Sequence, residues 1–156
     1  MKFPSLFMIC CGLALLFFTA DISQAFNAAH LQRLKETKHC RKCDLSNANL
    51  SGLNLTFAAM REANLSGANL SGANLEASFM PGANLSGANL SGANLQTANL
   101  KQANLSNANF TGATLNNAQL NGANITGTNF SKAFLYNTVW IDGAWCQVGS
   151  YGECKK

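Results

Sequence analysis

The stretch ANLSGANLSGANL, residues 63–75, returns unchanged at residues 83–95 and decides the fold of this chain. Its unit is five residues long and consists of a small residue, Asn, a large apolar residue and two small or polar residues. A large apolar residue occupies every fifth position from Leu45 to Trp140 without a slip in phase. Such an internal repeat takes precedence over any assignment of ordinary helices or strands.

A period of five is typical of neither a strand nor a helix, because these repeat every two or every 3.6 residues. It fits a chain that makes a quarter turn in every five residues, so that four repeats close one square turn. The large residue and the small residue two positions before it then point inward, and the other three point outward. Stacked turns bury a continuous apolar column, and their backbones pair at the strand spacing of about 4.8 Å. Gly and Asn suit the tight corners.

These residues resemble the pentapeptide-repeat family, whose signature is a tandem A(N/D)LXX repeat. The resemblance covers Arg41 to about Trp140, roughly two thirds of the chain. It implies an all-β fold, a right-handed quadrilateral β-helix, and a solenoid of about five coils. It implies little about function, because the repeat is a scaffold and function depends on the residues displayed on it. The basic leader, the Cys-x-x-Cys before the repeats and the Cys-containing tail look like those of secreted and lumenal bacterial members.

The first 25 residues are typical of an export signal. Lys2 precedes an apolar run over residues 6–20, and the small-residue pattern Ser23-Gln24-Ala25 follows, which predicts a signal peptide over 1–25. The run is shorter than the roughly 20 apolar residues of a membrane-spanning helix, so we expect no stable membrane insertion after cleavage. The predicted location is the periplasm, the extracellular space or the thylakoid lumen, with a bacterial origin favoured.

Three further segments follow the signal peptide. Residues 26–40 are predicted to form a short basic helical cap, with Leu31 and Leu34 at helical spacing behind an N-capping Asn27. Residues 41–140 form the β-helix, and residues 141–156 form a Cys-containing C-terminal cap. Both ends of a solenoid need such covers, because they expose apolar core and unpaired backbone. We expect Trp140, Trp145 and Tyr151 to cover the C-terminal end.

Four cysteines lie beyond the signal peptide: Cys40, Cys43, Cys146 and Cys154. They allow three pairings, and a disulfide requires Cα atoms within about 7 Å. Because the two pairs flank a column about 24 Å long, local pairs are favoured unless the tail folds back. In an oxidising compartment these pairs are most simply end staples. Free thiols and other pairings remain open alternatives.

The Cys-x-x-Cys is the one motif with reactive potential. A thiol–disulfide redox module built on Cys40 and Cys43 is the alternative function, although the helix start and βαβ pattern typical of such modules are missing. Haem attachment needs a His after the second Cys, whereas His39 precedes the first. A zinc site would lack a fourth ligand. We therefore expect no metal and no cofactor.

Residues suited to catalysis are scarce. The two histidines, His30 and His39, both lie in the N-terminal cap, and the carboxylates are scattered, so no acid–base pair or triad stands out. No glycine-rich phosphate loop lies between a strand and a helix. The sequence predicts no catalytic residue and no enzyme.

The lateral faces differ in their displayed residues. Two faces present monotonous Ser and Thr, while the other two carry the irregular residues. Stacking at a period of twenty brings two phenylalanines near one corner, where they form the candidate binding patch with an adjacent ion pair: Phe57, Arg61, Glu62 and Phe79. Aromatic residues and Arg are the usual anchors of partner sites, although single exposed apolar residues are also normal.

Charge narrows the class of partner. The chain has a formal net charge of +4, and its basic residues gather before the repeats instead of forming a stripe, which argues against nucleic-acid binding. Family members that mimic DNA need a strongly acidic surface, which is absent here. The sequence therefore predicts a non-catalytic exported scaffold or protein-binding solenoid. It leaves the partner and the oligomeric state open.

Overall fold

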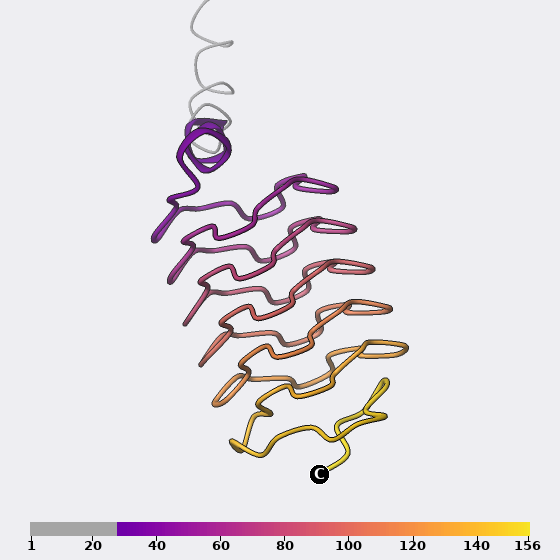
Figure 1. The fold of residues 1–156 in the computed structure, drawn as a ribbon. Helices are drawn as coiled ribbons and strands as arrows, with labels where there is room; N and C mark the ends of the chain where they lie inside the picture. Colours follow the sequence, from indigo (N-terminus) through magenta and orange to yellow (C-terminus); the bar gives the residue numbers. More distant parts are fainter. Residues whose placement is uncertain (1–27) are drawn as a thin grey trace, which may run out of the picture.

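The structure is a computed structural model that describes residues 28–156. It consists of one helix over residues 28–37, a stack of square turns and a short tail (Figure 1). The signal peptide expected over residues 1–25 and the N-capping role of Asn27 lie outside the described residues. No helix within residues 28–156 has the length and apolar character needed to cross a membrane.

The N-terminal helix lies across the first turn of the stack (Figure 1). Leu34 is fully buried and Leu31 packs partly buried against the core, as their helical spacing predicts. The helix ends where Lys38 adopts a φ of 60°, and the Lys38 N–H donates to the Leu34 carbonyl at 3.0 Å. A left-handed residue with this bond is a common helix terminus. The chain then enters the stack at His39, which pairs with Ala59.

Each turn of the stack contains twenty residues. Single residues spaced five apart form parallel β-bridges to the residue twenty positions later, as Asn64 does with Asn84. Two kinds of backbone bond join adjacent turns: Leu65 N–H donates to Asn84 O at 2.7 Å, and Asn84 N–H donates to Ala63 O at 2.9 Å. Only three residues lie between successive two-residue corners, and only the middle one forms a bridge, so the bridges do not extend into longer strands.

The repeated Asn has two bonding roles that explain its place in the unit. Its side-chain oxygen accepts the N–H of the residue two positions later, as in Ser66 N–H to Asn64 Oδ1 at 3.2 Å, which fixes the corner. Its amide nitrogen donates to the Asn of the preceding turn, as from Asn84 to Asn64 at 3.3 Å and from Asn104 to Asn84 at 3.2 Å. These ladders tie successive turns together along the column.

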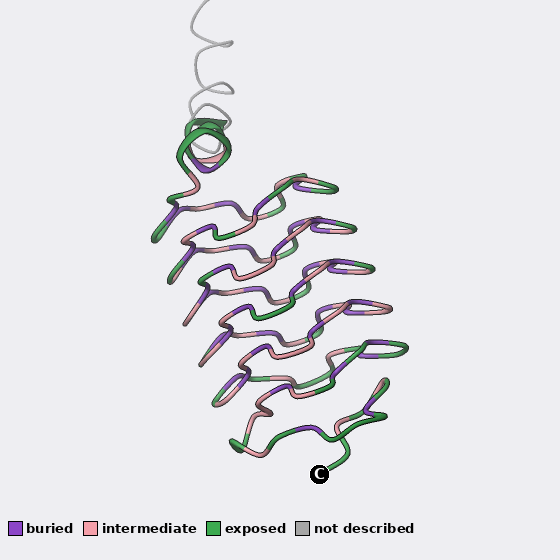
Figure 2. Cartoon of the chain, viewed as in Figure 1, coloured by how far each residue is buried: buried purple, intermediate pink, exposed green. Residues whose placement is uncertain are grey.

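The core is the apolar column that the period of five predicts. The inward Leu and Ala side chains are buried throughout the middle of the stack, and the corners are exposed or half-buried (Figure 2). Leu53, which replaces the usual small residue, is partly buried against the same core. Near the C-terminal end the column turns aromatic, with ring centroids 5.2 Å apart for Phe110 and Phe130 and 5.3 Å apart for Phe130 and Trp140.

The tail differs from the expected lid. Trp140 does pack on the end of the column, but Trp145 is 55% exposed and Tyr151 is 51% exposed. These two residues form antiparallel bridges, Trp145 with Val139 and Tyr151 with Phe134. The expectation that both residues cover the column is therefore wrong, because backbone pairing aligns them with two walls of the last turn and leaves their side chains half exposed.

Candidate functional site

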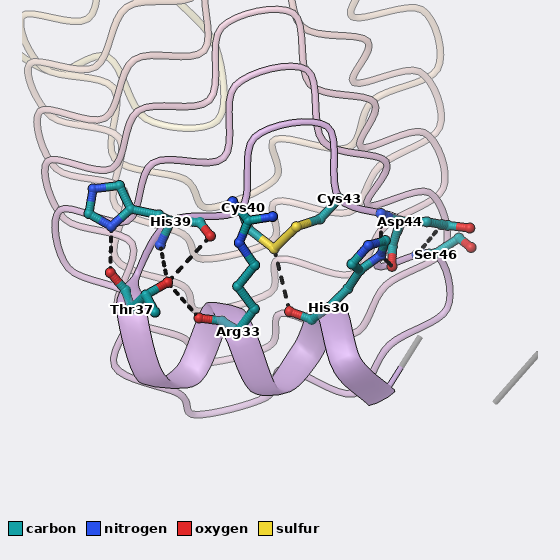
Figure 3. Close-up of a disulfide and its surroundings, with 8 residues drawn as sticks. All are labelled: His30, Arg33, Thr37, His39, Cys40, Cys43, Asp44 and Ser46. Atoms are coloured by element: carbon teal, nitrogen blue, oxygen red, sulfur yellow. Dashed lines mark hydrogen bonds between the residues drawn. A yellow bond between two sulfur atoms is a disulfide. The ribbon is translucent and has the colours of Figure 1, made fainter. Parts of the chain in front are cut away.

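The N-terminal cysteines lie at the junction of the helix and the first turn (Figure 3). Cys40 is bonded to Cys43 with a Cα–Cα distance of 5.2 Å, and both residues are buried. The Cys40 sulfur also lies 3.4 Å from the His30 carbonyl oxygen, a packing contact because a disulfide sulfur has no proton to donate. A buried pair of this kind is suited to structure more than to thiol exchange. Its role as a staple stays a prediction.

The two histidines serve the same junction. The Asp44 N–H donates to His30 Nδ1 at 3.1 Å, which joins the helix to the first turn (Figure 3). Hydrogen bonds from Ser46, together with one from Asn64 and the nearby His30, lower the pKa of Asp44. His39 is exposed and contacts the end of the helix through the Thr37 hydroxyl, which accepts its N–H at 3.1 Å.

Residues 28–156 contain no cluster of three or more His, Cys, Asp or Glu side chains placed to hold a metal ion. The C-terminal cysteines form the second pair, Cys146 with Cys154, at a Cα–Cα distance of 5.0 Å.

Phe57 is the most conspicuous lateral residue. Its side chain is 74% exposed, and its φ is 59°, in the left-handed region. Many equivalent corners hold Gly or Asn, as at Gly52 and Asn47. Large residues such as Lys42 and Glu62 adopt the same conformation at their corners, so the exposure of its ring, and not its φ, distinguishes Phe57.

Of the other three residues of the predicted patch, Phe79 lies on the next side of the square, and Arg61 and Glu62 form the corner that follows it. Phe79 is 43% exposed and pairs with Ala59 of the turn above. Arg61 donates to Glu62 at 2.9 Å, and this ion pair is exposed to solvent. We call the four residues Phe57, Arg61, Glu62 and Phe79 the aromatic corner.

Glu62 is shared by several cations. Lys42 lies 3.4 Å from its carboxylate and Arg41 lies 4.0 Å from it, in addition to Arg61. The hydrogen bond from Arg61 is the main cause of a lowered Glu62 pKa, with Lys42 contributing further. One carboxylate facing three cations leaves this part of the surface positively charged.

An open groove of about 400 Å³ runs along the stack beside the aromatic corner. Arg61, Pro81, Lys101 and Asn121 follow one another at intervals of twenty residues, so they line one column of the solenoid. Phe79 belongs to the same lining. We call these five residues the basic groove.

Two polar groove residues, Lys101 and Asn121, lie outside the predicted patch. Lys101 is half-buried and makes no ion pair with any described residue. The Asn121 side-chain oxygen is buried and has no hydrogen-bond partner. The period of twenty places Lys101 two turns below Arg61, and this spacing could have been used to predict that the two residues share one surface. Nothing in the sequence indicated the buried Asn121 oxygen.

Comparisons with known proteins agree with the repeat. The family model described as pentapeptide repeats matches residues 39–67, 68–107 and 103–139 in eight copies. No curated protein sequence matches the chain significantly.

Solved structures of pentapeptide-repeat proteins are also similar to the chain. HetL from the cyanobacterium Nostoc, which is involved in regulating heterocyst differentiation, is 32% identical over 69% of this chain and 57% of its own, with a TM-score of 0.34. Rfr23 from the cyanobacterium Cyanothece is 31% identical over 72% of this chain and 98% of its own, also with a TM-score of 0.34. A protein of the Arabidopsis thaliana thylakoid lumen is 29% identical over 65% and 68% of the respective chains, with a TM-score of 0.39.

Proposed function

Because the chain belongs to the pentapeptide-repeat family, we propose that it is an exported, non-catalytic solenoid that binds another protein through the aromatic corner. Members of this family are right-handed quadrilateral β-helices and generally non-catalytic, and some of them act through protein interactions. These family properties support a binding role in general. The exported location and the choice of surface are our own inferences.

The observation that carries the choice of surface is Phe57. A left-handed conformation costs a non-glycine residue about 1–2 kcal/mol, and burial offsets little of this cost because the ring is 74% exposed. The stack would be at least as stable with Gly or Asn at this corner. An exposed aromatic ring one corner away from Arg61 has the character of a binding anchor.

Site-specific photo-crosslinking in the native host tests the proposal. Phe57 is replaced by p-benzoylphenylalanine, and the matched control carries the same replacement at Asn107, an exposed corner with a φ of 56° on a monotonous face. We expect position 57 to crosslink one specific exported protein and position 107 to give none. Equal crosslinking from both positions, or none from position 57, contradicts the proposal.

The substitution Phe57→Gly separates binding from stability. We expect it to abolish partner binding and to raise the free energy of unfolding by about 0.5 kcal/mol, since relief of the left-handed strain outweighs the entropy cost of Gly. Chemical denaturation measures the stability, and co-purification with the crosslinked partner measures the binding. A variant that loses stability and keeps the partner would show that Phe57 serves the fold.

A further inference from the structure

The basic groove has a composition that selects one class of ligand. Its cations, Arg61 and Lys101, lie two turns apart, which is about 10 Å at the strand spacing, and Pro81 lies between them. Pro81 carries no charged group, so an anion has room between the two cations. Lys101 makes no ion pair with any described residue.

The charges around the groove favour an acidic ligand. Glu62 is the only carboxylate that an ion pair links to the described groove residues, and Arg41, Lys42 and Arg61 all surround it. No acidic side chain lines the groove itself. The surface here therefore carries a surplus of positive charge that a carboxylate of a partner would complement.

The apolar part of the lining favours a peptide over a bare inorganic anion. Phe79 and Pro81 supply apolar surface, which suits an aliphatic or aromatic side chain. A peptide supplies a carboxylate and an apolar side chain together, whereas a polyanion such as nucleic acid would call for a longer basic stripe.

We propose that the basic groove binds an extended acidic peptide segment of the partner protein, with its carboxylates on Arg61 and Lys101 and an apolar side chain on Phe79. This inference rests on the proposed function and names the chemistry of the partner. It extends the proposed binding surface from the aromatic corner down the column to Lys101.

Selection of random heptapeptides displayed on phage, with the immobilised disulfide-bonded protein as bait, tests the ligand class. We expect the enriched sequences to contain Asp or Glu beside an apolar residue. The enriched peptides are then synthesised with a fluorophore, and their Kd values are measured by fluorescence anisotropy. Sequences without an excess of acidic residues, or no enrichment at all, overturn the inference.

Variants then locate the binding site. Lys101→Gln and Arg61→Gln should each weaken the peptide about tenfold, the loss expected for one charge-assisted hydrogen bond. The matched control is Lys132→Gln, which alters an exposed lysine outside the groove and should leave the Kd unchanged. Binding that is indifferent to Lys101→Gln overturns the inference.

Crosslinking from position 57 distinguishes this inference from the proposed function. If the Lys101→Gln protein still crosslinks its partner as efficiently as the unmodified protein, the proposed function stands and the groove inference fails. If position 57 gives no specific crosslink and the selected peptides also bind independently of Arg61 and Lys101, both fail. Circular dichroism and thermal melting of every variant establish that the fold is retained.

Discussion

The two ends of the column are covered to different extents. At the N-terminal end the helix buries Leu34, and the first inward residues, Leu45 and Leu50, are no more than 1% exposed. At the C-terminal end Ile125 and Trp140 are only partly buried. A helix lays a continuous apolar stripe across a square turn, whereas an irregular tail covers only the sides with which it pairs.

Backbone bonding explains the incomplete cover. The tail continues two sides of the last turn, with Leu135 N–H donating to Ser150 O at 3.1 Å and Asn137 N–H donating to Cys146 O at 2.9 Å. On the other sides, the N–H groups of Ile125, Gly127 and Phe130 donate no backbone hydrogen bond within the described residues. The solenoid therefore ends with part of its last turn unpaired.

The largest expected effect comes from truncating apolar side chains at the two ends of the column. Leu34→Ala should lower the free energy of unfolding by about 3 kcal/mol, because it leaves a cavity in a fully buried site. Ile125→Ala should cost less than half as much, because its side chain is already partly exposed. Urea unfolding measures both. Equal losses would mean that the two ends are equally well packed.

The disulfides give the next effect. Closing the short N-terminal loop contributes about 2 kcal/mol and closing the longer C-terminal loop about 2.5 kcal/mol in the chain-entropy model. Cys40 and Cys43 are both buried, while Cys154 is only partly buried. We expect a mild reductant to open Cys146–Cys154 first, as followed by alkylation and peptide mass spectrometry. Selective opening of Cys40–Cys43 would instead favour the redox function.

The smallest effect concerns acid stability at the helix junction. Hydrogen bonds from Ser46 and Asn64 lower the pKa of Asp44 in the folded state. The ionised carboxylate thus adds stability above its unfolded pKa, and this contribution is lost as the pH falls through the lower folded pKa. On acidification from about pH 5 to about pH 2, the Tm of the Asp44→Asn variant should therefore fall less than that of the unmodified protein. An equal fall of Tm in the two proteins over this pH range would contradict the prediction.

The repeat predicted the architecture because each five-residue unit forms one side of a turn and contributes the same inward residues. A large residue at every fifth position and a small one two positions earlier specified the buried column, and the period of twenty correctly placed Phe79 beside Ala59. The helix followed from the spacing of Leu31 and Leu34. In each case a local pattern repeats or obeys a known period.

The remaining features depend on side chains whose neighbours are set by three-dimensional packing. The period gave the position of Lys101 but not its lack of an ion partner, which depends on Glu62 turning toward Arg61, Lys42 and Arg41. The prediction that Trp145 and Tyr151 cover the C-terminal end of the column was wrong, because it relied on the aromatic composition of the tail. Antiparallel pairing aligns Trp145 with a wall of the last turn instead.

Because each turn contains twenty residues, the alignment of residues on the surface depends on the length of any insertion in the chain. Arg61 and Lys101 line one groove because a whole number of turns separates them. An insertion of five residues between them would keep every Leu inside yet rotate all later residues by one side of the square, placing the two cations on different faces. An insertion of twenty would lengthen the groove by one rung and keep its alignment. Changes in length that spare the fold can therefore still erase the proposed binding surface.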